Sequence, residues 1–176
     1  MSSYNQYLNE ADTTALVDLI KSVSPKRMIE FGCNLGRTAK TLLDNVSTLE
    51  TYIGIDVPFG FEPTLPCQQR EIPVTPGYYA ANDPRFFLLI AEQGSLSLTL
   101  SDLEPCDAIF IDGDHSERVV RHDSYLARVL TRPGGIIVWH DFGNPAVEVT
   151  QTLSGLSDKG WPIQSVNGTW LAFMRM

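Results

Sequence analysis

Short apolar runs alternate along this chain with segments whose apolar residues recur at helical spacing. This alternation predicts a mostly parallel sheet with helices on both faces, because parallel strands must be joined by crossover connections. The expected strands are residues 27–32, 51–56, 86–91, 106–112, 136–139, 162–166 and 169–174. The expected helices are residues 12–23, 37–46, 116–130 and 144 to 155 or 160. The predicted fold class is therefore α/β, with a Rossmann-like doubly wound sheet.

Local signals mark the ends of several elements. Asp12 is expected to cap the first helix, and Asn144 with Pro145 is expected to begin the last one. Asn167-Gly168 lies between the last two strand-like runs and predicts a β-hairpin. The last strand should therefore run antiparallel to its neighbour.

Residues 57–84 interrupt the alternation with six prolines and two glycines, which predicts an irregular excursion. A loop of this length is expected to be a lid or a binding wall, or else to be disordered. Neither a repeat nor a low-complexity tract divides the 176 residues, which suffice for one core. We therefore predict a single domain over residues 1–176.

The net charge and the composition of the chain limit the classes of molecule that it is expected to bind. Thirteen Lys and Arg against 21 Asp and Glu give a net charge of −8. The basic residues are scattered, so nucleic acid and anionic membrane are not expected as partners, and a small molecule is. The apolar runs are too short to span a bilayer, and the polar start does not resemble a signal peptide. Three widely spaced cysteines predict reduced thiols in a cytoplasmic protein.

The first two strands end in residues suited to bind a nucleoside. Gly32 and Gly36 follow the first strand, and glycines there let the backbone turn tightly and a ligand approach closely. Asp56 ends the second strand, where a carboxylate can accept both hydroxyls of a ribose. In doubly wound sheets, ligands bind at the carboxyl ends of strands. These junctions predict a nucleoside-containing cofactor.

The glycine spacing distinguishes between such cofactors. The turn reads Gly-x-x-x-Gly, with Asn34 where the dinucleotide fingerprint has its middle glycine. Glu30 stands two residues before the first glycine, and its charge would repel a pyrophosphate but attract an ammonium or sulfonium group. S-adenosylmethionine is therefore favoured, and a dinucleotide-dependent oxidoreductase is disfavoured.

Four segments together resemble the class I S-adenosylmethionine-dependent methyltransferases. They are residues 30–36, 53–56, 107–115 and 132–141. Phe-Ile-Asp-Gly-Asp-His at 110–115 and the later His140-Asp141 are similar to the small O-methyltransferases related to catechol and macrocin O-methyltransferases. The resemblance covers residues 12–176. It implies a seven-stranded sheet with an antiparallel last strand, and methyl transfer to a hydroxyl of a small molecule.

The resemblance also implies a cofactor site. Its residues would be Glu30, Gly32, Cys33, Asn34, Gly36, Asp56, Ser95 and Asp112. The residues from the first turn would flank the methionine end, and Asp56 would hold the ribose. Ser95 would lie near the adenine and Asp112 near the sulfonium. Cys33 is expected to pack as a small side chain and not to act as a thiolate.

Methyl transfer to a hydroxyl also requires the removal of a proton. His115, beside Asp112, is the predicted base, so these two are the predicted catalytic residues. Asp112 and Asp141 match positions that hold a divalent cation in metal-dependent relatives, and Mg²⁺ could complete its shell there with waters. His140 and Phe142 do not supply the oxygen ligand that the pattern expects. Metal-dependent and metal-free chemistry both stay open.

Other conspicuous residues have structural interpretations. Asp114 and Glu117 are spaced like a helix N-cap and its N3 partner. His122 falls inside a predicted helix, and Trp139 is expected in the core. Tyr78-Tyr79 would either line an acceptor pocket or anchor the excursion.

One alternative function belongs to a different class. A catalytically silent module could bind S-adenosylmethionine or S-adenosylhomocysteine without turnover. Relatives build a substrate cover from an N-terminal extension, and about eleven residues precede the first helix here. If the protein is instead an active enzyme, the excursion at residues 57–84 or a second subunit of a homo-oligomer would have to close the site.

Overall fold

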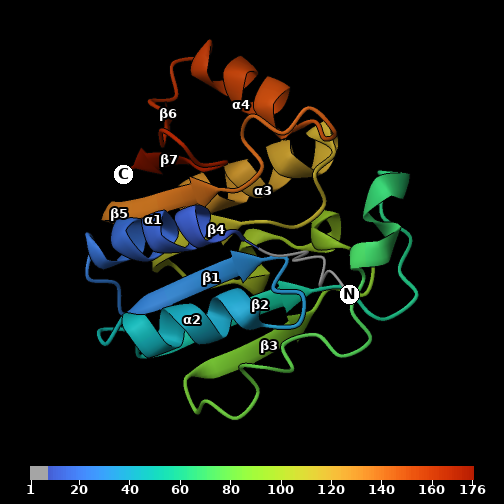
Figure 1. The fold of residues 1–176 in the computed structure, drawn as a ribbon, viewed down its shortest axis with the longest axis vertical. Coiled ribbons are helices and arrows are strands. Elements are labelled where there is room, and N and C mark those ends of the chain that lie inside the picture. The colour runs from blue at the N-terminus through green and yellow to red at the C-terminus, as the bar shows by residue number, and fades with distance from the viewer. Residues whose placement is uncertain (1–7) are drawn as a thin grey trace.

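The computed structural model describes residues 8–176, which form a seven-stranded sheet in the order β3-β2-β1-β4-β5-β7-β6 (Figure 1). The strands are β1 Arg27–Phe31, β2 Thr51–Asp56, β3 Phe86–Ile90, β4 Cys106–Ile111, β5 Thr131–Trp139, β6 Gln164–Ser165 and β7 Ala172–Arg175. Strands β1 to β5 pair in parallel, and β7 is antiparallel to both of its neighbours. The predicted fold class and the hairpin are confirmed.

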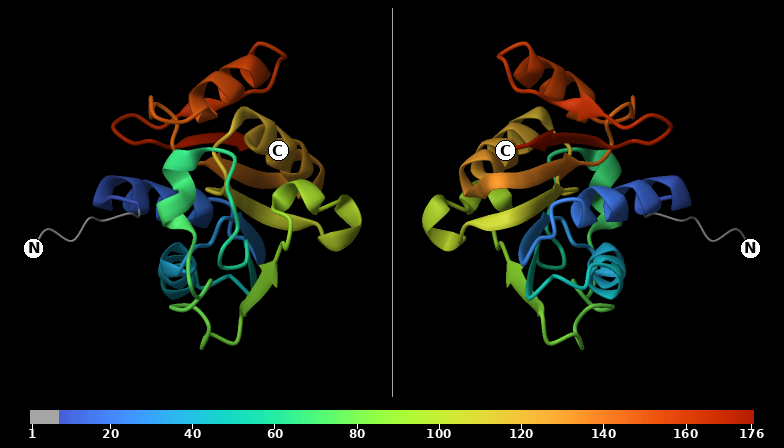
Figure 2. Two further views of the ribbon diagram at one scale, coloured as in Figure 1. Left: turned by 90° about the vertical axis from the view of Figure 1, so that its right-hand side faces the viewer. Right: turned by 90° about the vertical axis from the view of Figure 1, so that its left-hand side faces the viewer.

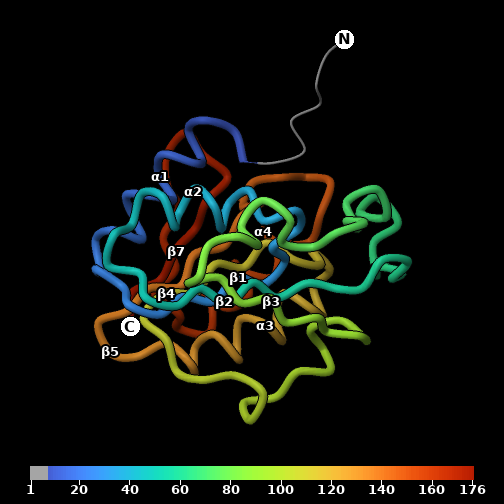
Figure 3. The backbone as a smooth tube through the Cα atoms, turned by 90° about the horizontal axis from the view of Figure 1, so that it is seen from below, coloured from blue at the N-terminus to red at the C-terminus, as the bar shows by residue number. Residues whose placement is uncertain are grey.

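Helices cover both faces of the sheet. They are α1 Glu10–Lys21, α2 Arg37–Asn45, α3 Glu117–Leu130 and α4 Val149–Ser157, with three 3₁₀ turns, η1 Pro66–Glu71, η2 Ser95–Ser97 and η3 Leu100–Asp102. Figure 3 shows α1 and α2 on one side of the strands and α3 on the other, and Figure 2 shows the same layers from both ends. Within the described residues, no helix has the length and apolarity needed to cross a membrane.

The strands bury side chains on both faces, as expected for a parallel sheet between helices. In β5, Ile136 packs with α1 and α2, whereas Ile137 and Trp139 pack with α3 and α4. Trp139 is fully buried, as predicted, and its indole N–H donates to the Ser124 hydroxyl at 2.9 Å. One core on each face thus holds the sheet, and its parallel strands β1 to β5 end along one edge.

Two predicted helix starts are wrong, and both corrections bear on the site. Asn9, not Asp12, caps α1, and Asp12 is 1% exposed. The last helix begins at Val149, because the Asn144 side chain instead donates to Asp141 Oδ1 at 2.6 Å. The Asp12 side chain is taken by a distant partner, the Trp170 amide, whereas Asn144 is taken by Asp141, three residues before it.

Two further boundaries differ from the predictions. Strand β5 begins at Thr131, five residues before the predicted start, because Thr131 pairs with Cys106 at the start of β4, and a register shift follows before Ile136 pairs with Ala108. Ser116 is the N-cap residue of α3, and Asp114 does not form the predicted capping pair with Glu117. Asp114 instead accepts from the Ser116 and Thr64 amides, each at 2.9 Å.

The excursion at residues 57–84 contains η1 and a series of turns, and it covers the edge of the sheet where the strand arrows of Figure 1 end. The Gly77 amide donates to the Asn34 carbonyl at 2.7 Å, and the Asn34 side chain donates to the Glu71 carbonyl at 2.6 Å. Cβ of an alanine at Gly36 would lie 2.9 Å from Gly77 Cα, so this approach needs glycine. The excursion is thereby fastened to the turn between β1 and α2.

Candidate active site

A pocket with an empty volume of about 800 Å³ lies beneath the excursion, at the carboxyl ends of β1, β2 and β4. The strand order reverses between β1 and β4, which is where doubly wound sheets bind ligands. The predicted site residues that line it are Gly32, Asn34, Asp56, Ser95 and Asp112.

Asp56 lies where a ribose-binding carboxylate is predicted. Its Oδ2 accepts from the Asn34 amide and its Oδ1 accepts from the Val57 amide at 2.8 Å. Burial raises the pKa of Asp56, and the two amide hydrogen bonds oppose that rise. Each carboxylate oxygen can accept a second hydrogen bond, so the side chain can hold its own turn and a ligand together.

The β1–α2 turn needs its glycines for backbone packing. Gly32 has φ +83°, and an added Cβ would lie 2.3 Å from the Asp112 carbonyl oxygen. Asn34 also has a positive φ of 46°, a conformation that asparagine tolerates better than most residues. Cys33 and Gly36 do not line the pocket. Cys33 is buried, and its burial raises the thiol pKa, in agreement with the predicted packing role.

Glu30 lies in the sheet and does not line the pocket, although a place in the cofactor site is predicted for it. It is 1% exposed and accepts a hydrogen bond from the Tyr52 hydroxyl at 2.8 Å. Burial raises the pKa of Glu30 well above its usual range. Its predicted contact with a cofactor stays a prediction.

Ser95 lines the far end of the pocket and donates to Asp123 Oδ2 at 3.0 Å. Asp123, on α3, also lines the pocket and was not singled out from the sequence. His122, expected to be structural, approaches the other Asp123 oxygen at 3.2 Å. Tyr78 and Tyr79 do not line the pocket.

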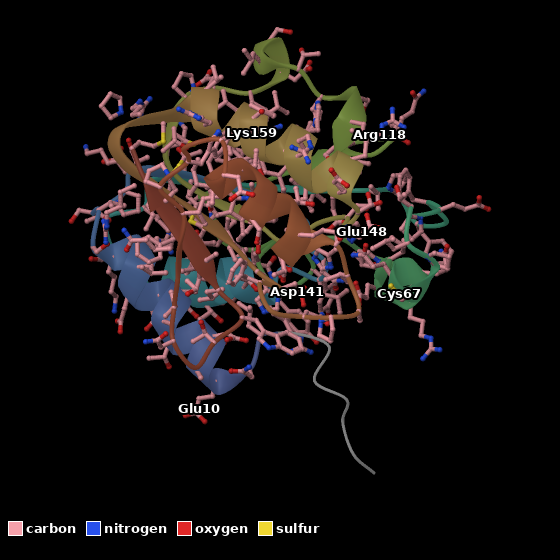
Figure 4. All side chains as sticks on the ribbon, turned by 90° about the horizontal axis from the view of Figure 1, so that it is seen from above. Glu10, Cys67, Arg118, Asp141, Glu148 and Lys159 are labelled. Atoms are coloured by element: carbon pink, nitrogen blue, oxygen red, sulfur yellow. The ribbon has the colours of Figure 1, made fainter. Side chains whose placement is uncertain are left out.

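Four titratable side chains, two carboxylates and two imidazoles, meet beside the pocket, and of the four only Asp112 lines it. His140 Nδ1 lies 3.2 Å from both Asp112 Oδ1 and Asp141 Oδ2. His115 Nε2 lies 3.4 Å from the same two oxygens and makes no hydrogen bond of good geometry. Asp141 is labelled in Figure 4, on the side of the molecule that also carries Cys67 of η1. The structure therefore brings together Asp112, His115 and Asp141, as predicted from the strand ends.

The charges in this cluster perturb one another strongly. Burial acts to raise the pKa of Asp112, but the neighbouring His140 and His115 hold it well below its usual range. Burial acts to lower the pKa of His140, but Asp112 and Asp141 raise it to about 11. The carboxylates of Asp112 and Asp141 thus stay ionised at neutral pH, and the His140 imidazolium is their counter-charge.

A comparison with family models decides what kind of protein carries this site. Residues 29–142 match the model of a methyltransferase domain. The chain belongs to the methyltransferase domain family. A search of curated proteins finds no match.

Solved structures share the fold of this methyltransferase domain at low sequence identity. The methyltransferase PaMTH1 of Podospora anserina, bound to S-adenosylhomocysteine, has a TM-score of 0.69 at 15% identity, over 99% of this chain and 82% of its own. An O-methyltransferase of Bacillus cereus, also with S-adenosylhomocysteine, has a TM-score of 0.68 at 14% identity, over 98% and 84%. TomG of Streptomyces achromogenes, an O-methyltransferase with S-adenosylmethionine, has a TM-score of 0.64 at 14% identity, over 98% and 83%.

The pocket of this methyltransferase domain is acidic. Five carboxylates line it, those of Asp56, Glu71, Asp112, Asp114 and Asp123, and its lining includes neither lysine nor arginine. Asp112 has two imidazoles beside it, but no lysine or arginine of the lining offsets the other four carboxylates, which therefore favour cationic ligands and oppose phosphates.

Sequence reasoning missed Gln68, which is 5% exposed and reaches the cluster from η1. Its Oε1 accepts from the His115 amide at 2.8 Å, and its Nε2 donates to the Gly113 carbonyl at 2.9 Å. These two contacts orient the amide, so the NH₂ group that lies 3.1 Å from His115 Nδ1 can only donate to it. A glutamine in a proline-rich excursion carries no sequence signal for this role.

The Gln68 contact also assigns the tautomer of His115. An Nδ1 that accepts a hydrogen bond leaves the ring proton on Nε2. A base that acts through Nε2 needs a lone pair there. The predicted role of His115 as the base therefore stays a prediction, and the hydrogen bonds of its ring oppose it.

Proposed function

We propose that this protein is an S-adenosylmethionine-dependent methyltransferase that methylates a hydroxyl of a small molecule. The single observation that carries the proposal is the acidic pocket at the place where the strand order reverses between β1 and β4, with Asp56 at the end of β2. S-adenosylmethionine carries a sulfonium and an ammonium group, whereas a dinucleotide carries phosphates, which these carboxylates would repel. Membership of the methyltransferase domain family supports the same conclusion.

The chemistry divides between cofactor and protein. S-adenosylmethionine supplies a methyl group on sulfur, and its transfer leaves the electron pair of the broken carbon–sulfur bond on that sulfur. We assign Asp56 to the ribose hydroxyls, Ser95 to the adenine end and Asp112 to the sulfonium end. Gly32 and Asn34 let the backbone approach the methionine portion.

We assign the acceptor hydroxyl to Asp112 Oδ2. Within the described residues, no hydrogen bond engages this oxygen, while Oδ1 faces both imidazoles. A weakly basic carboxylate suffices, because the hydroxyl proton becomes strongly acidic as the new carbon–oxygen bond forms. That proton passes to Asp112 Oδ2. His115 contributes by directing its Nε2–H toward the two carboxylates, which keeps Asp112 ionised.

The two carboxylates of the cluster fit a divalent cation, since Asp112 and Asp141 offer oxygen atoms within 4.8 Å of one another. Asp112 and Asp141 are the proposed carboxylate ligands. A cation held there would supply Lewis-acid stabilisation of a developing alkoxide.

Further properties belong to the same proposal. We propose one domain, a small-molecule acceptor and a cytoplasmic location, which the three free cysteines support. We also propose that the excursion is the wall of the site, because Gln68 and Glu71 line the pocket from above. Homo-oligomer formation remains an expectation.

Calorimetric titration tests the cofactor assignment. S-adenosylmethionine and S-adenosylhomocysteine are expected to bind at one site, and NAD is expected not to bind. Tight NAD binding would contradict the proposal. Turnover with a panel of phenol and alcohol acceptors then tests the enzyme, and binding without turnover of any acceptor would favour the silent module.

A further inference from the structure

Asp123 lines the pocket from α3, and the cofactor assignment gives it no role. We propose that Asp123 is a positioning residue that fixes the direction of the Ser95 hydroxyl, so that this end of the pocket selects a base with a 6-amino group over its 6-oxo analogue. This inference rests on the proposed function and deepens it, since it concerns the base of the same cofactor. Its test compares the affinities of two nucleosides, so its failure is distinguishable from failure of the cofactor assignment.

The strand order places the base of a bound nucleoside beside Ser95. Neighbouring strands lie in the order β3-β2-β1-β4 (Figure 1), with Asp112 directly after β4 and Asp56 at the end of β2. Because Asp112 is assigned to the sulfonium and Asp56 to the ribose, the base extends in the same direction, over the end of β3. Ser95 follows β3 in η2. The pocket lining at that end includes Ser95, Leu96, Val119 and Asp123.

The proton of the Ser95 hydroxyl points away from the ligand space. Ser95 Oγ donates to Asp123 Oδ2 at 3.0 Å, and the other Asp123 oxygen lies 3.2 Å from His122 Nδ1. Asp123 is 1% exposed; burial raises its pKa, but the hydrogen bonds with His122 and Ser95 oppose that rise and favour the ionised form. An ionised carboxylate can only accept, so Ser95 Oγ has only lone pairs to offer a ligand.

An oxygen that can only accept distinguishes between purine bases. The 6-amino group is the only hydrogen-bond donor on the adenine base of a nucleoside, since the ring nitrogens accept. Ser95 Oγ can therefore pair with adenine only through the 6-amino group. In the 6-oxo analogue an acceptor replaces that group, and two sets of lone pairs would face each other. A site built to pair with an N–H group discriminates strongly against an analogue that lacks it, because a buried polar group is then left unpaired.

The selectivity belongs to Asp123 and not to Ser95 alone. A serine hydroxyl without a fixed partner can rotate, and it would donate to an oxo group as readily as it would accept from an amino group. The fixed partner comes from α3, 28 residues along the chain from Ser95. Asp123 thus acts on the base through Ser95, and its own side chain stays buried behind the pocket wall.

Calorimetric titration with S-adenosylhomocysteine and with S-inosylhomocysteine, its 6-oxo analogue, tests the inference. The wild-type protein should bind S-adenosylhomocysteine at least tenfold more tightly than S-inosylhomocysteine. Equal affinities for the two nucleosides would overturn the role of Asp123 and leave the cofactor assignment standing. Binding of neither nucleoside would overturn both.

Three variants separate positioning from structure, and the ratio of the two affinities is the measured quantity. Asp123→Ala frees the Ser95 hydroxyl to rotate and should lower the ratio at least fivefold. A purely structural role would weaken both ligands equally, so an unchanged ratio would refute the inference.

Ser95→Ala removes the accepting oxygen and should also lower the ratio at least fivefold. It decides the question if Asp123→Ala does not fold, since a ratio kept at the wild-type value would overturn the inference. Asp102→Ala is the matched control, because Asp102 accepts from the Thr99 hydroxyl at 2.7 Å outside the pocket. It should keep the wild-type ratio.

Discussion

Asp56→Ala tests the cofactor site through two separable effects. The substitution removes the acceptor of the Asn34 and Val57 amides. A buried unsatisfied donor costs about 1–3 kcal/mol, and water from the pocket will satisfy part of this deficit, so we expect a loss of about 2 kcal/mol in unfolding free energy. For a chain of this size, that lowers Tm by about 4–8 °C.

Asp56→Ala should also lower the affinity for the cofactor, and this second effect is separate from the loss of unfolding free energy. Hydrogen bonds to a charged acceptor contribute about 1.5–3 kcal/mol each, and about 1.4 kcal/mol is a factor of ten in affinity. We therefore expect the Kd for S-adenosylhomocysteine to rise more than tenfold, measured by calorimetry at a temperature where the variant is folded.

Asp102→Ala is the matched control for Asp56→Ala. Asp102 also accepts a backbone amide, that of Thr99 at 2.8 Å, but it lies in η3 and does not line the pocket. This control should lose some stability and keep its affinity for S-adenosylhomocysteine. If Asp56→Ala bound S-adenosylhomocysteine as tightly as the control, Asp56 would not be part of the cofactor site. The inference that the carboxylate at the end of β2 holds the ribose would then be refuted.

Further substitutions probe the turn, the sheet and the cluster. Gly32→Ala places Cβ 2.3 Å from the Asp112 carbonyl oxygen and should prevent stable folding. Its control is Gly155→Ala, in an open helical position, which should raise the unfolding free energy by about 0.5–1 kcal/mol. Equal melting temperatures of the two variants would contradict the clash at Gly32. Burial raises the pKa of Glu30, so the folded state binds its proton more tightly than the unfolded state. The stabilisation is complete below the unfolded pKa of about 4.3 and is lost as pH rises through the folded pKa. Glutamine carries no charge at any pH, so the Tm of Glu30→Gln minus the Tm of the wild type should grow as pH rises. A difference in Tm that does not change with pH would contradict a buried, ionising Glu30. His115→Ala should lower turnover and leave S-adenosylhomocysteine affinity unchanged; normal turnover would remove His115 from the catalytic group.

The fold could be predicted from the sequence because its signals are local. The apolar run at 106–111 indicates a buried strand, and Asn167-Gly168 indicates the closing hairpin; both are confirmed. The same order of elements places Asp56 and Asp112 at the carboxyl ends of β2 and β4. Because parallel strands end at one edge of a sheet, the sequence also predicted that these carboxylates would line one pocket.

The hydrogen-bond partners within the site could not be predicted in this way. Asp12 has the spacing of a helix cap but lies against His140, and Gln68 stands in an irregular segment but orients His115. These contacts join residues 128 and 47 positions apart. Periodicity and turn chemistry describe a chain's interactions with its near neighbours, whereas the proton positions on the two imidazoles depend on groups that only the folded sheet and its covering excursion bring together. The sequence alone determined the architecture and the acidic edge, and the tertiary structure decided which nitrogen atoms face it.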